Sequence, residues 1–221
     1  MTALRNPFPL SNHRASLARY LRGIVVPGLC VAGQIIAERL PAQYARDPLR
    51  PSLVLWACDA ADGDLADALP VAAAFDLFDR FLLLHDELTD GSAATVASWG
   101  LGQSLNAGDA FYALGFRSLA SDVSNPGRRL EAARLVGQAI LESIEKNNDD
   151  VARSASLTAA AMQAGAVVAG APEQIARAFA EAGRLLVKDP MEAVAAMGHC
   201  TSGNDLTAFE EIARYVARQA A

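Results

Sequence analysis

The chain has 221 residues, of which 52% are hydrophobic, and a net charge of −6. This length and composition suffice for one domain with a large core. The acidic balance argues against a nucleic-acid partner, because phosphate binding needs clustered Lys and Arg. No apolar segment reaches the roughly 20 residues of a transmembrane helix, and the N-terminal residues lack a signal-peptide pattern. Three widely spaced cysteines, Cys30, Cys58 and Cys200, indicate reduced core thiols in a cytoplasmic protein.

Helical patterns cover almost the whole sequence and no segment is typical of a strand. Alanine and leucine dominate and β-branched residues are sparse, which favours helices. In chain order, the expected helices span about 11–22, 27–40, 52–61, 70–88, 95–103, 104–121, 128–147, 156–169, 172–187, 191–197 and 206–219. We therefore expect an all-α fold, formed by a single domain over residues 1–221.

The segment 81–90 is an apolar helical run that ends in a cluster of acids. Asp86 and Asp90 are four residues apart, so they share one face of a helix, and Glu87 is close enough to join them. Carboxylates suit Mg²⁺, which prefers oxygen ligands and often bridges carboxylates to substrate phosphates. The pattern indicates a diphosphate site; the alternative interpretation is a solvated helix end.

Four segments, in the expected order, resemble motifs of the trans-isoprenyl diphosphate synthases, or polyprenyl synthetases. Leu49-Arg-Pro-Ser-Leu-Val-Leu55 is similar to the family's diphosphate-binding segment, which makes Arg50 the matching arginine. His85-Asp-Glu-Leu-Thr-Asp90 resembles the first aspartate-rich motif of the family. The other two segments, Gly100-Leu-Gly-Gln-Ser-Leu-Asn-Ala-Gly-Asp-Ala110 and Gly165-Ala-Val-Val-Ala-Gly170, resemble its Asn-Ala-Gly-Asp segment and a later Gly/Ala-rich packing helix.

The resemblance implies a helical bundle of the isoprenoid synthase type with a central apolar cavity, here shortened at its C-terminal end. It implies Mg²⁺ as cofactor, an allylic prenyl diphosphate as ligand, and assembly as a homodimer or as a heterodimer with a prenyl synthase. Phe81, five residues before Asp86, stands where the family uses a bulky side chain to floor the pocket, which suggests substrates of C10 to C15 size. The resemblance assigns Asp86 and Asp90 to catalysis, and Asp86, Glu87 and Asp90 to metal binding. It assigns Arg50 to diphosphate binding. The residues that it places in the pocket are Phe81, Leu82, Asn147 and Asp150.

The sequence also departs from the family's pattern. Glu87 replaces the second Asp of the first motif. Asp47 and Pro48 stand where the family has a lysine and an arginine before the residue that matches Arg50. Leu157 stands where the family has a lysine, so that lysine is missing here. The second aspartate-rich motif is missing, because Lys188-Asp-Pro-Met-Glu192 stands in its expected place. These changes remove most of the basic residues that a second, isopentenyl diphosphate would need.

Ordinary chain elongation requires two diphosphates in one pocket, whereas ionisation of a single allylic diphosphate requires only the metal-bound end and a sheltering apolar cavity. We therefore expect ionisation followed by cyclisation, elimination or atypical prenyl transfer. The alternative is a non-catalytic, degenerate subunit that pairs with an active prenyl diphosphate synthase and modulates it. A helical scaffold unrelated to prenyl chemistry is a third interpretation.

For the polar residues beside the acidic motif, the sequence favours packing over chemistry. His85 is expected to be a hydrogen-bonded packing residue. Asn106 and Asp109 are expected to form buried hydrogen bonds between helices, because buried polar groups are almost always paired.

Overall fold

The computed structural model describes residues 11–24, 49–90, 94–145, 149–201 and 203–220, and these contain ten helices and no strand. The helices are α1 (Ser11–Ile24), α3 (Leu49–Asp59), α4 (Leu65–Thr89), α5 (Ala94–Trp99), α6 (Leu101–Asp122), α7 (Pro126–Glu145), α8 (Asp150–Ala169), α9 (Glu173–Lys188), α10 (Pro190–Met197) and α11 (Gly203–Ala220). The all-α prediction is confirmed. The helix expected over 27–40 lies outside the described residues.

Several helices begin earlier than the sequence predicts, and in two of them, α4 and α8, an aspartate caps the N-terminus. The Asp64 carboxylate accepts the backbone N–H of Ala66 at 2.8 Å, so α4 starts one turn before Pro70, which lies inside the helix. The Asp149 carboxylate accepts the N–H of Ala152 at 2.9 Å and starts α8 six residues before the predicted position. Such side chains satisfy backbone donors that the first turn leaves unpaired.

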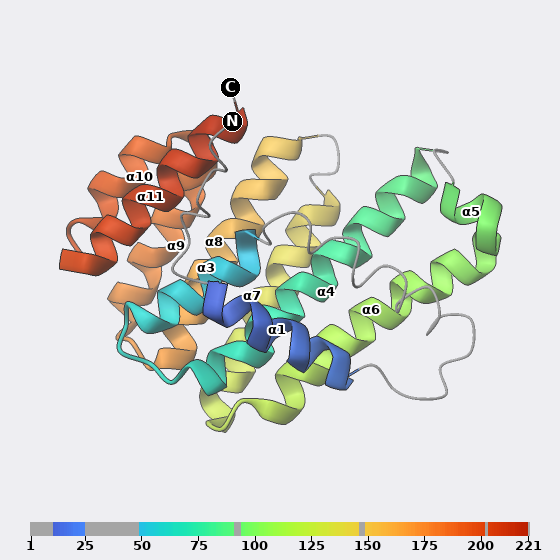
Figure 1. The fold of residues 1–221 in the computed structure, drawn as a ribbon, viewed down its shortest axis with the longest axis horizontal. Coiled ribbons are helices and arrows are strands. Elements are labelled where there is room, and N and C mark those ends of the chain that lie inside the picture. Colours follow the sequence, from blue (N-terminus) through green and yellow to red (C-terminus); the bar gives the residue numbers. More distant parts are fainter. Residues whose placement is uncertain (1–10, 25–48, 91–93, 146–148, 202, 221) are drawn as a thin grey trace.

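Helix α8 lies at the centre of the bundle and packs against α3, α4, α7 and α9 (Figure 1). Helices α9, α10 and α11 form one side of the molecule. On the other side, α4 and α6 run antiparallel beside each other, with the short α5 between their far ends (Figure 1). The face that α4 turns towards α3 and α8 is therefore distinct from the face that packs on α6.

Small residues allow α8 to approach α3 closely. A Cβ at Gly165 would lie 2.3 Å from the carbonyl oxygen of Val54 and 2.9 Å from the Cβ of Ala57, so only glycine fits. Ala164 and Ala166, on either side, are fully buried. The predicted Gly/Ala-rich packing helix is thus confirmed.

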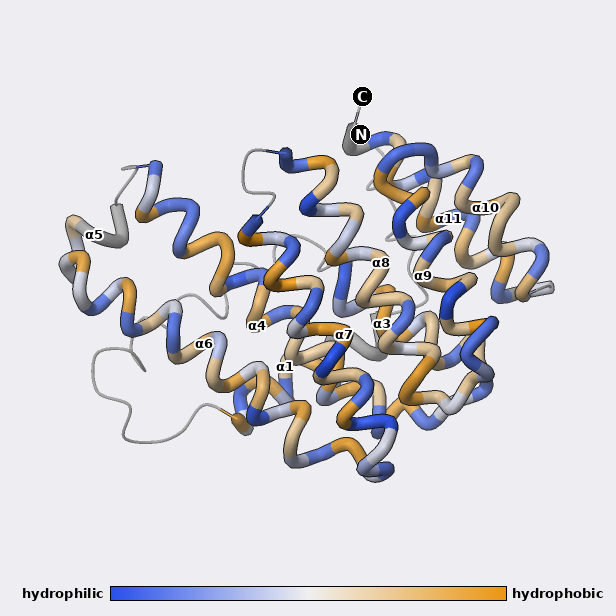
Figure 2. Tube along the Cα trace, turned by 180° about the vertical axis from the view of Figure 1, so that it is seen from behind, coloured by the Kyte–Doolittle hydropathy of each residue, from blue (hydrophilic) through white to orange (hydrophobic). Residues whose placement is uncertain are grey.

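Aromatic stacking joins the second half of the bundle to α3. The indole of Trp56 stacks on Phe179 of α9 and Phe209 of α11, with ring centroids 5.6 and 4.8 Å apart. Hydrophilic and hydrophobic residues alternate along α9 and α11, which is typical of helices that bury one face and expose the other (Figure 2). Among the helices described, none combines the length and the apolar character that a membrane span requires.

Two of the three cysteines fall within the described residues, and both are free thiols. Cys58 is buried in the core, and burial raises its pKa from 9.0 to about 12. Cys200 is half-buried against the core.

Candidate functional site

Three ion pairs follow one another along the face of α4 that is turned towards α3 and α8. Asp76 and Arg80 pair within α4 at 2.7 Å, Asp79 pairs with Arg50 of α3 at 2.6 Å, and Asp86 pairs with Arg153 of α8. We call these residues the ion-pair seam: Asp76, Arg80, Asp79, Arg50, Asp86 and Arg153. The seven-residue spacing of Asp79 and Asp86 places both on one helix face, two turns apart.

Arg50, the predicted diphosphate-binding residue, lies in the middle of the seam. Besides its ion pair with Asp79, its Nη2 donates to the Ser154 hydroxyl of α8 at 3.1 Å, while its buried Nε has no hydrogen-bond partner. The side chains of Arg50 and Asp79 are 21% and 29% exposed. Burial raises the pKa of Asp79, against the opposing effect of Arg50 and, more weakly, of Arg80 and Arg153.

Asp86, the first acid of the aspartate-rich motif, is held by both ends of one guanidinium. Arg153 Nη1 donates to Asp86 Oδ1 at 3.2 Å, and Nη2 donates to Oδ2. The hydrogen bond to Asp86 raises the pKa of Arg153, against the effect of its own burial. The side chains are 17% and 33% exposed, so this pair is better shielded from water than an ordinary surface ion pair.

Sequence reasoning missed Arg153. One signal was available: Arg153 is the single basic residue of α8, a helix otherwise made mainly of small and apolar residues. A lone arginine in such a helix needs a buried acidic partner, because an unpaired charge is costly to bury. The position of that partner on α4 was not readable from the spacing.

The other two acids of the motif lie at the end of α4. Glu87 is half-buried, and Asp90 is exposed at the C-cap, where its backbone N–H donates to the carbonyl of Asp86. Within the described residues, no three His, Cys, Asp or Glu side chains gather closely enough to bind a metal ion. In the part of the chain that the structure describes, a metal ion would therefore need ligands besides protein side chains.

The donor chemistry nevertheless fits the usual way in which proteins bind Mg²⁺. This ion commonly uses one or two carboxylates together with substrate phosphates and several waters. Asp86 and Asp90 supply carboxylate oxygens on successive turns, and the C-terminal end of a helix dipole favours a cation. Arg153 donates to both oxygens of Asp86 in this structure, so a metal ion would compete with it for this carboxylate.

The predicted pocket residues do not gather on the seam. The ring of Phe81 packs towards α6, with centroids 4.5 Å from His85 and 5.3 Å from Tyr112. Leu82 is buried in the core. Asp150 is exposed in the first turn of α8, three residues before Arg153, and its charge also raises the pKa of Arg153. Asn147 lies outside the described residues. A pocket role for these four residues stays a prediction.

The Asn-Ala-Gly-Asp segment packs differently from the prediction. Asn106 and Asp109 are exposed, Asp109 by 74% of its side chain, so the prediction of buried hydrogen bonds is wrong. The buried members are Ala107 and Gly108, because the ring of His85 lies directly on Gly108. The packing role of His85 is confirmed, but its Nε2 has no hydrogen-bond partner and lies 4.0 Å from Asp109 Oδ1.

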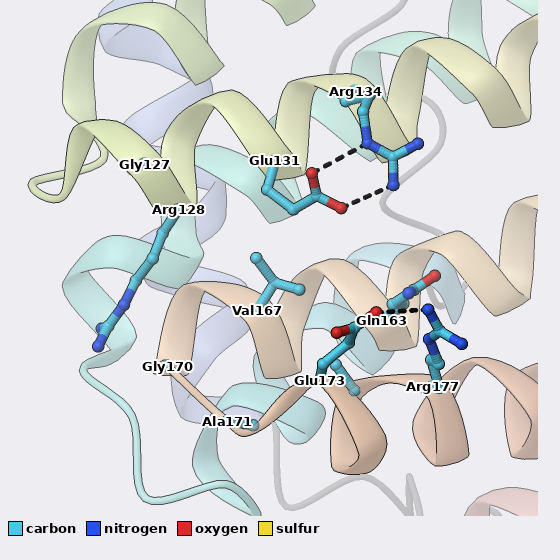
Figure 3. Close-up of a pocket in the computed structure, with 11 residues that line it drawn as sticks. Gly127, Arg128, Glu131, Arg134, Gln163, Val167, Gly170, Ala171, Glu173 and Arg177 are labelled. Carbon is cyan, nitrogen blue, oxygen red and sulfur yellow. Dashed lines mark hydrogen bonds and ion pairs between the residues drawn. The ribbon is translucent and has the colours of Figure 1, made fainter.

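A separate pocket of about 570 Å³ lies between α7, α8 and α9 (Figure 3). Figure 3 shows four of its charged side chains in two pairs, Glu131 with Arg134 on α7 and Glu173 with Arg177 on α9. The pocket lies at the end of α8 opposite Arg153, about 20 Å away at the rise of a helix. It is therefore not part of the seam.

Sequence comparison places the chain beside enzymes of isoprenoid synthesis. It is 28% identical over 162 residues to a geranylgeranyl diphosphate synthase of Methanosarcina mazei, a match that covers 62% of this chain and 50% of that protein. It is 34% identical over 158 residues to a (2E,6E)-farnesyl diphosphate synthase of Mycobacterium tuberculosis, covering 62% and 44%. Over the matched part, the chain is thus similar to trans-isoprenyl diphosphate synthases. No family model matches the sequence.

Solved structures show the same isoprenoid synthase fold. A geranylgeranyl pyrophosphate synthetase from the archaeon Geoglobus acetivorans superposes with a TM-score of 0.82 at 13% identity, covering 94% of this chain and 98% of that one. A polyprenyl synthase from Caulobacter crescentus, complexed with calcium and isoprenyl diphosphate, has a TM-score of 0.77 at 18% identity, with 97% of each chain covered. The chain spans about half the length of the curated relatives that it matches.

Proposed function

We propose that the chain binds an allylic prenyl diphosphate together with Mg²⁺ at the C-terminal end of α4. The observation that carries this proposal is the convergence of Arg50, Arg153 and Asp86 from three different helices on one seam. Arg50 and Arg153 provide guanidinium groups suited to phosphate oxygens, and Asp86 and Asp90 provide carboxylates suited to the metal. Similarity to prenyl diphosphate synthases supports the choice of a prenyl diphosphate over other phosphates.

The proposed reaction is ionisation of the bound allylic diphosphate. The bond between the allylic carbon and the diphosphate oxygen breaks, and the electron pair leaves with the diphosphate. Bound Mg²⁺ would supply charge neutralisation on that leaving group. Arg50 would hold the diphosphate by charge-assisted hydrogen bonds, and an apolar cavity would keep water from the carbocation.

The carbocation then has three outcomes. It can be attacked by a double bond of its own chain, lose a proton, or be captured by an acceptor. These outcomes correspond to cyclisation, elimination and atypical prenyl transfer. Ordinary elongation is not proposed, because the basic residues for a second diphosphate are missing at Asp47, Pro48 and Leu157.

The decisive experiment measures diphosphate release by the purified chain from C10, C15 and C20 allylic diphosphates, without isopentenyl diphosphate. We expect release that requires Mg²⁺ and that is abolished by Asp86→Ala and Asp90→Ala. Glu181→Ala, an exposed acid on α9, serves as the control and should leave release unchanged. Full activity of the two aspartate variants would reject the assignment of the acidic motif.

A second candidate function is a non-catalytic subunit that modulates an active prenyl diphosphate synthase. It is favoured by the engagement of Asp86 with Arg153 and by the lack of a three-acid group among the described residues. Under this proposal the chain alone consumes no prenyl diphosphate but changes the product length of a synthase with which it associates. Turnover by the chain alone would exclude it.

We also propose that the protein works as a dimer in the cytoplasm. The free thiols of Cys58 and Cys200 support a reducing compartment. Helix α6 exposes Leu101, Leu105 and Tyr112, which are large apolar side chains suited to an interface with a second copy or a related synthase. Sedimentation of the purified chain, alone and as Leu105→Glu, would test self-association.

A further inference from the structure

We propose that Arg153 and a metal ion compete for Asp86, and that the metal ion, by displacing Arg153, makes its guanidinium available to the diphosphate. This inference rests on the proposed function, since it concerns the same ligands at the same site. It assigns to Arg153 a role in coupling the binding of the metal to the binding of the diphosphate. None of the sequence motifs contains this residue.

The first argument is geometric. The two Nη atoms of Arg153 engage both carboxylate oxygens of Asp86, so the guanidinium uses the oxygens that a metal ion would need. The pair is mostly shielded from water, and a bidentate arginine–carboxylate contact is among the stronger ionic hydrogen-bond arrangements. A metal ion that uses the same lone pairs of Asp86 therefore competes with this ion pair.

The second argument concerns where the displaced guanidinium remains. Arg153 is anchored on α8 next to Ser154, the residue that also accepts a hydrogen bond from Arg50. Against the larger effect of burial, the positive charge of Arg153 also lowers the pKa of Asp79, which belongs to the next ion pair along the seam. When Arg153 leaves Asp86 it stays beside Arg50, and two neighbouring guanidinium groups suit the oxygens of a diphosphate.

The third argument is charge balance. With its three aspartates and three arginines ionised, the ion-pair seam sums to zero. A divalent metal alone would leave it at +2, and a diphosphate ester alone at −3, whereas both together leave −1. Each ligand therefore improves the site for the other, and thermodynamic linkage requires that the effect be reciprocal.

The test is a titration with Mn²⁺, followed by the electron paramagnetic resonance of the free ion, with and without inorganic diphosphate. In the wild type we expect weak binding of the metal alone and an affinity that rises about tenfold or more when diphosphate is present. In Arg153→Gln, the metal alone should bind about tenfold more tightly, because Asp86 is free. Diphosphate should then enhance metal binding much less, and should itself bind more weakly.

Two controls separate this role from a structural one. Arg177→Gln removes an exposed arginine from an ion pair on α9 and should leave both affinities unchanged. Arg153→Lys keeps the charge but loses the bidentate contact, so it should give intermediate values and also serves if Arg153→Gln does not fold. Asp86→Asn should weaken metal binding in either background.

The outcomes are distinct from those of the turnover assay. Equal metal affinity in wild type, Arg153→Gln and Arg153→Lys would overturn the inference even if the wild type releases diphosphate. If the metal binds tightly only to Arg153→Gln and the wild type shows no turnover, Arg153 competes with the metal for Asp86 but the chain does not ionise prenyl diphosphates.

Discussion

The ring of His85 on α4 packs directly against Gly108 on α6, and a Cβ at position 108 would lie 2.6 Å from His85 Nε2. This contact lies one residue before Asp86, so it positions the end of α4 that carries the acidic motif. The Asn-Ala-Gly-Asp segment is therefore explained by helix packing: its glycine lets α4 and α6 approach, while Asn106 and Asp109 point to the surface.

Gly108→Ala is expected to destabilise the protein by about 1–3 kcal/mol, because the added methyl group forces His85 or the helices apart. The free energy of unfolding, measured in urea, checks this. We also expect weaker Mn²⁺ binding, since the end of α4 shifts.

Gly102→Ala is the matched control on the same helix. A Cβ at Gly102 meets nothing within 4 Å, so the substitution should be neutral or raise the free energy of unfolding by up to about 1 kcal/mol through helix propensity. If Gly108→Ala were as stable as Gly102→Ala, the close approach of α4 and α6 would not be a requirement of the fold.

The pair of Arg50 and Asp79 gives a second prediction. Arg50→Gln leaves the Asp79 carboxylate half-buried and unpaired, which should cost about 1–3 kcal/mol of unfolding free energy. Adding Asp79→Asn should recover part of this loss, because two neutral amides replace an isolated charge. Urea unfolding of both single variants and the double variant measures the coupling between the residues. A double variant that loses the sum of the two single losses would contradict the pairing.

The sequence predicted the helical class and most helix positions because apolar spacing and helix-ending glycines are local signals. It placed the start of α8 six residues too late, because the apolar pattern begins only after the first turns, whereas the Asp149 carboxylate caps the helix. It also placed the start of α6 three residues late, since Gly100, with φ of 78°, ends α5.

The site was predicted less completely than the fold, for a physical reason. Asp86 and Arg50 could be assigned from local motifs, but their partners are 67 and 29 residues away in the chain. Which charges face one another across helices depends on how the helices rotate and pack, and that information is not contained in any single segment. Arg153 and Asp79 therefore emerge only from the three-dimensional arrangement.

Asp149→Ala tests the cap of α8. Loss of the hydrogen bond to Ala152 should lower the free energy of unfolding by about 1 kcal/mol, the usual contribution of an N-cap side chain. The neighbouring Asp150→Ala removes a helix-dipole interaction and the attraction between Asp150 and Arg153, but no cap hydrogen bond, and should cost less, about 0.3–1 kcal/mol. Since Arg153 lies in the first turn of α8, hydrogen exchange should also increase there in Asp149→Ala alone. Equal effects of the two substitutions would show that charge, not capping, stabilises this end.

Tyr20 of α1 gives a pH-dependent prediction. Its hydroxyl lies within hydrogen-bond distance of Ser118 and donates to Asp122, and burial, together with the bond to Asp122, raises its pKa from 10.0 to about 12. The folded state thus keeps a proton that the unfolded chain loses above pH 10. The stability that the Tyr20 hydroxyl contributes is therefore complete below pH 10 and falls as the pH rises to 12.

Tyr20→Phe should cost about 1 kcal/mol of unfolding free energy at pH 8, from the lost hydrogen bonds. The difference in unfolding free energy between wild type and Tyr20→Phe, measured in urea at pH 8, 10 and 11, should shrink with rising pH; a constant difference would show that the folded state does not hold this proton.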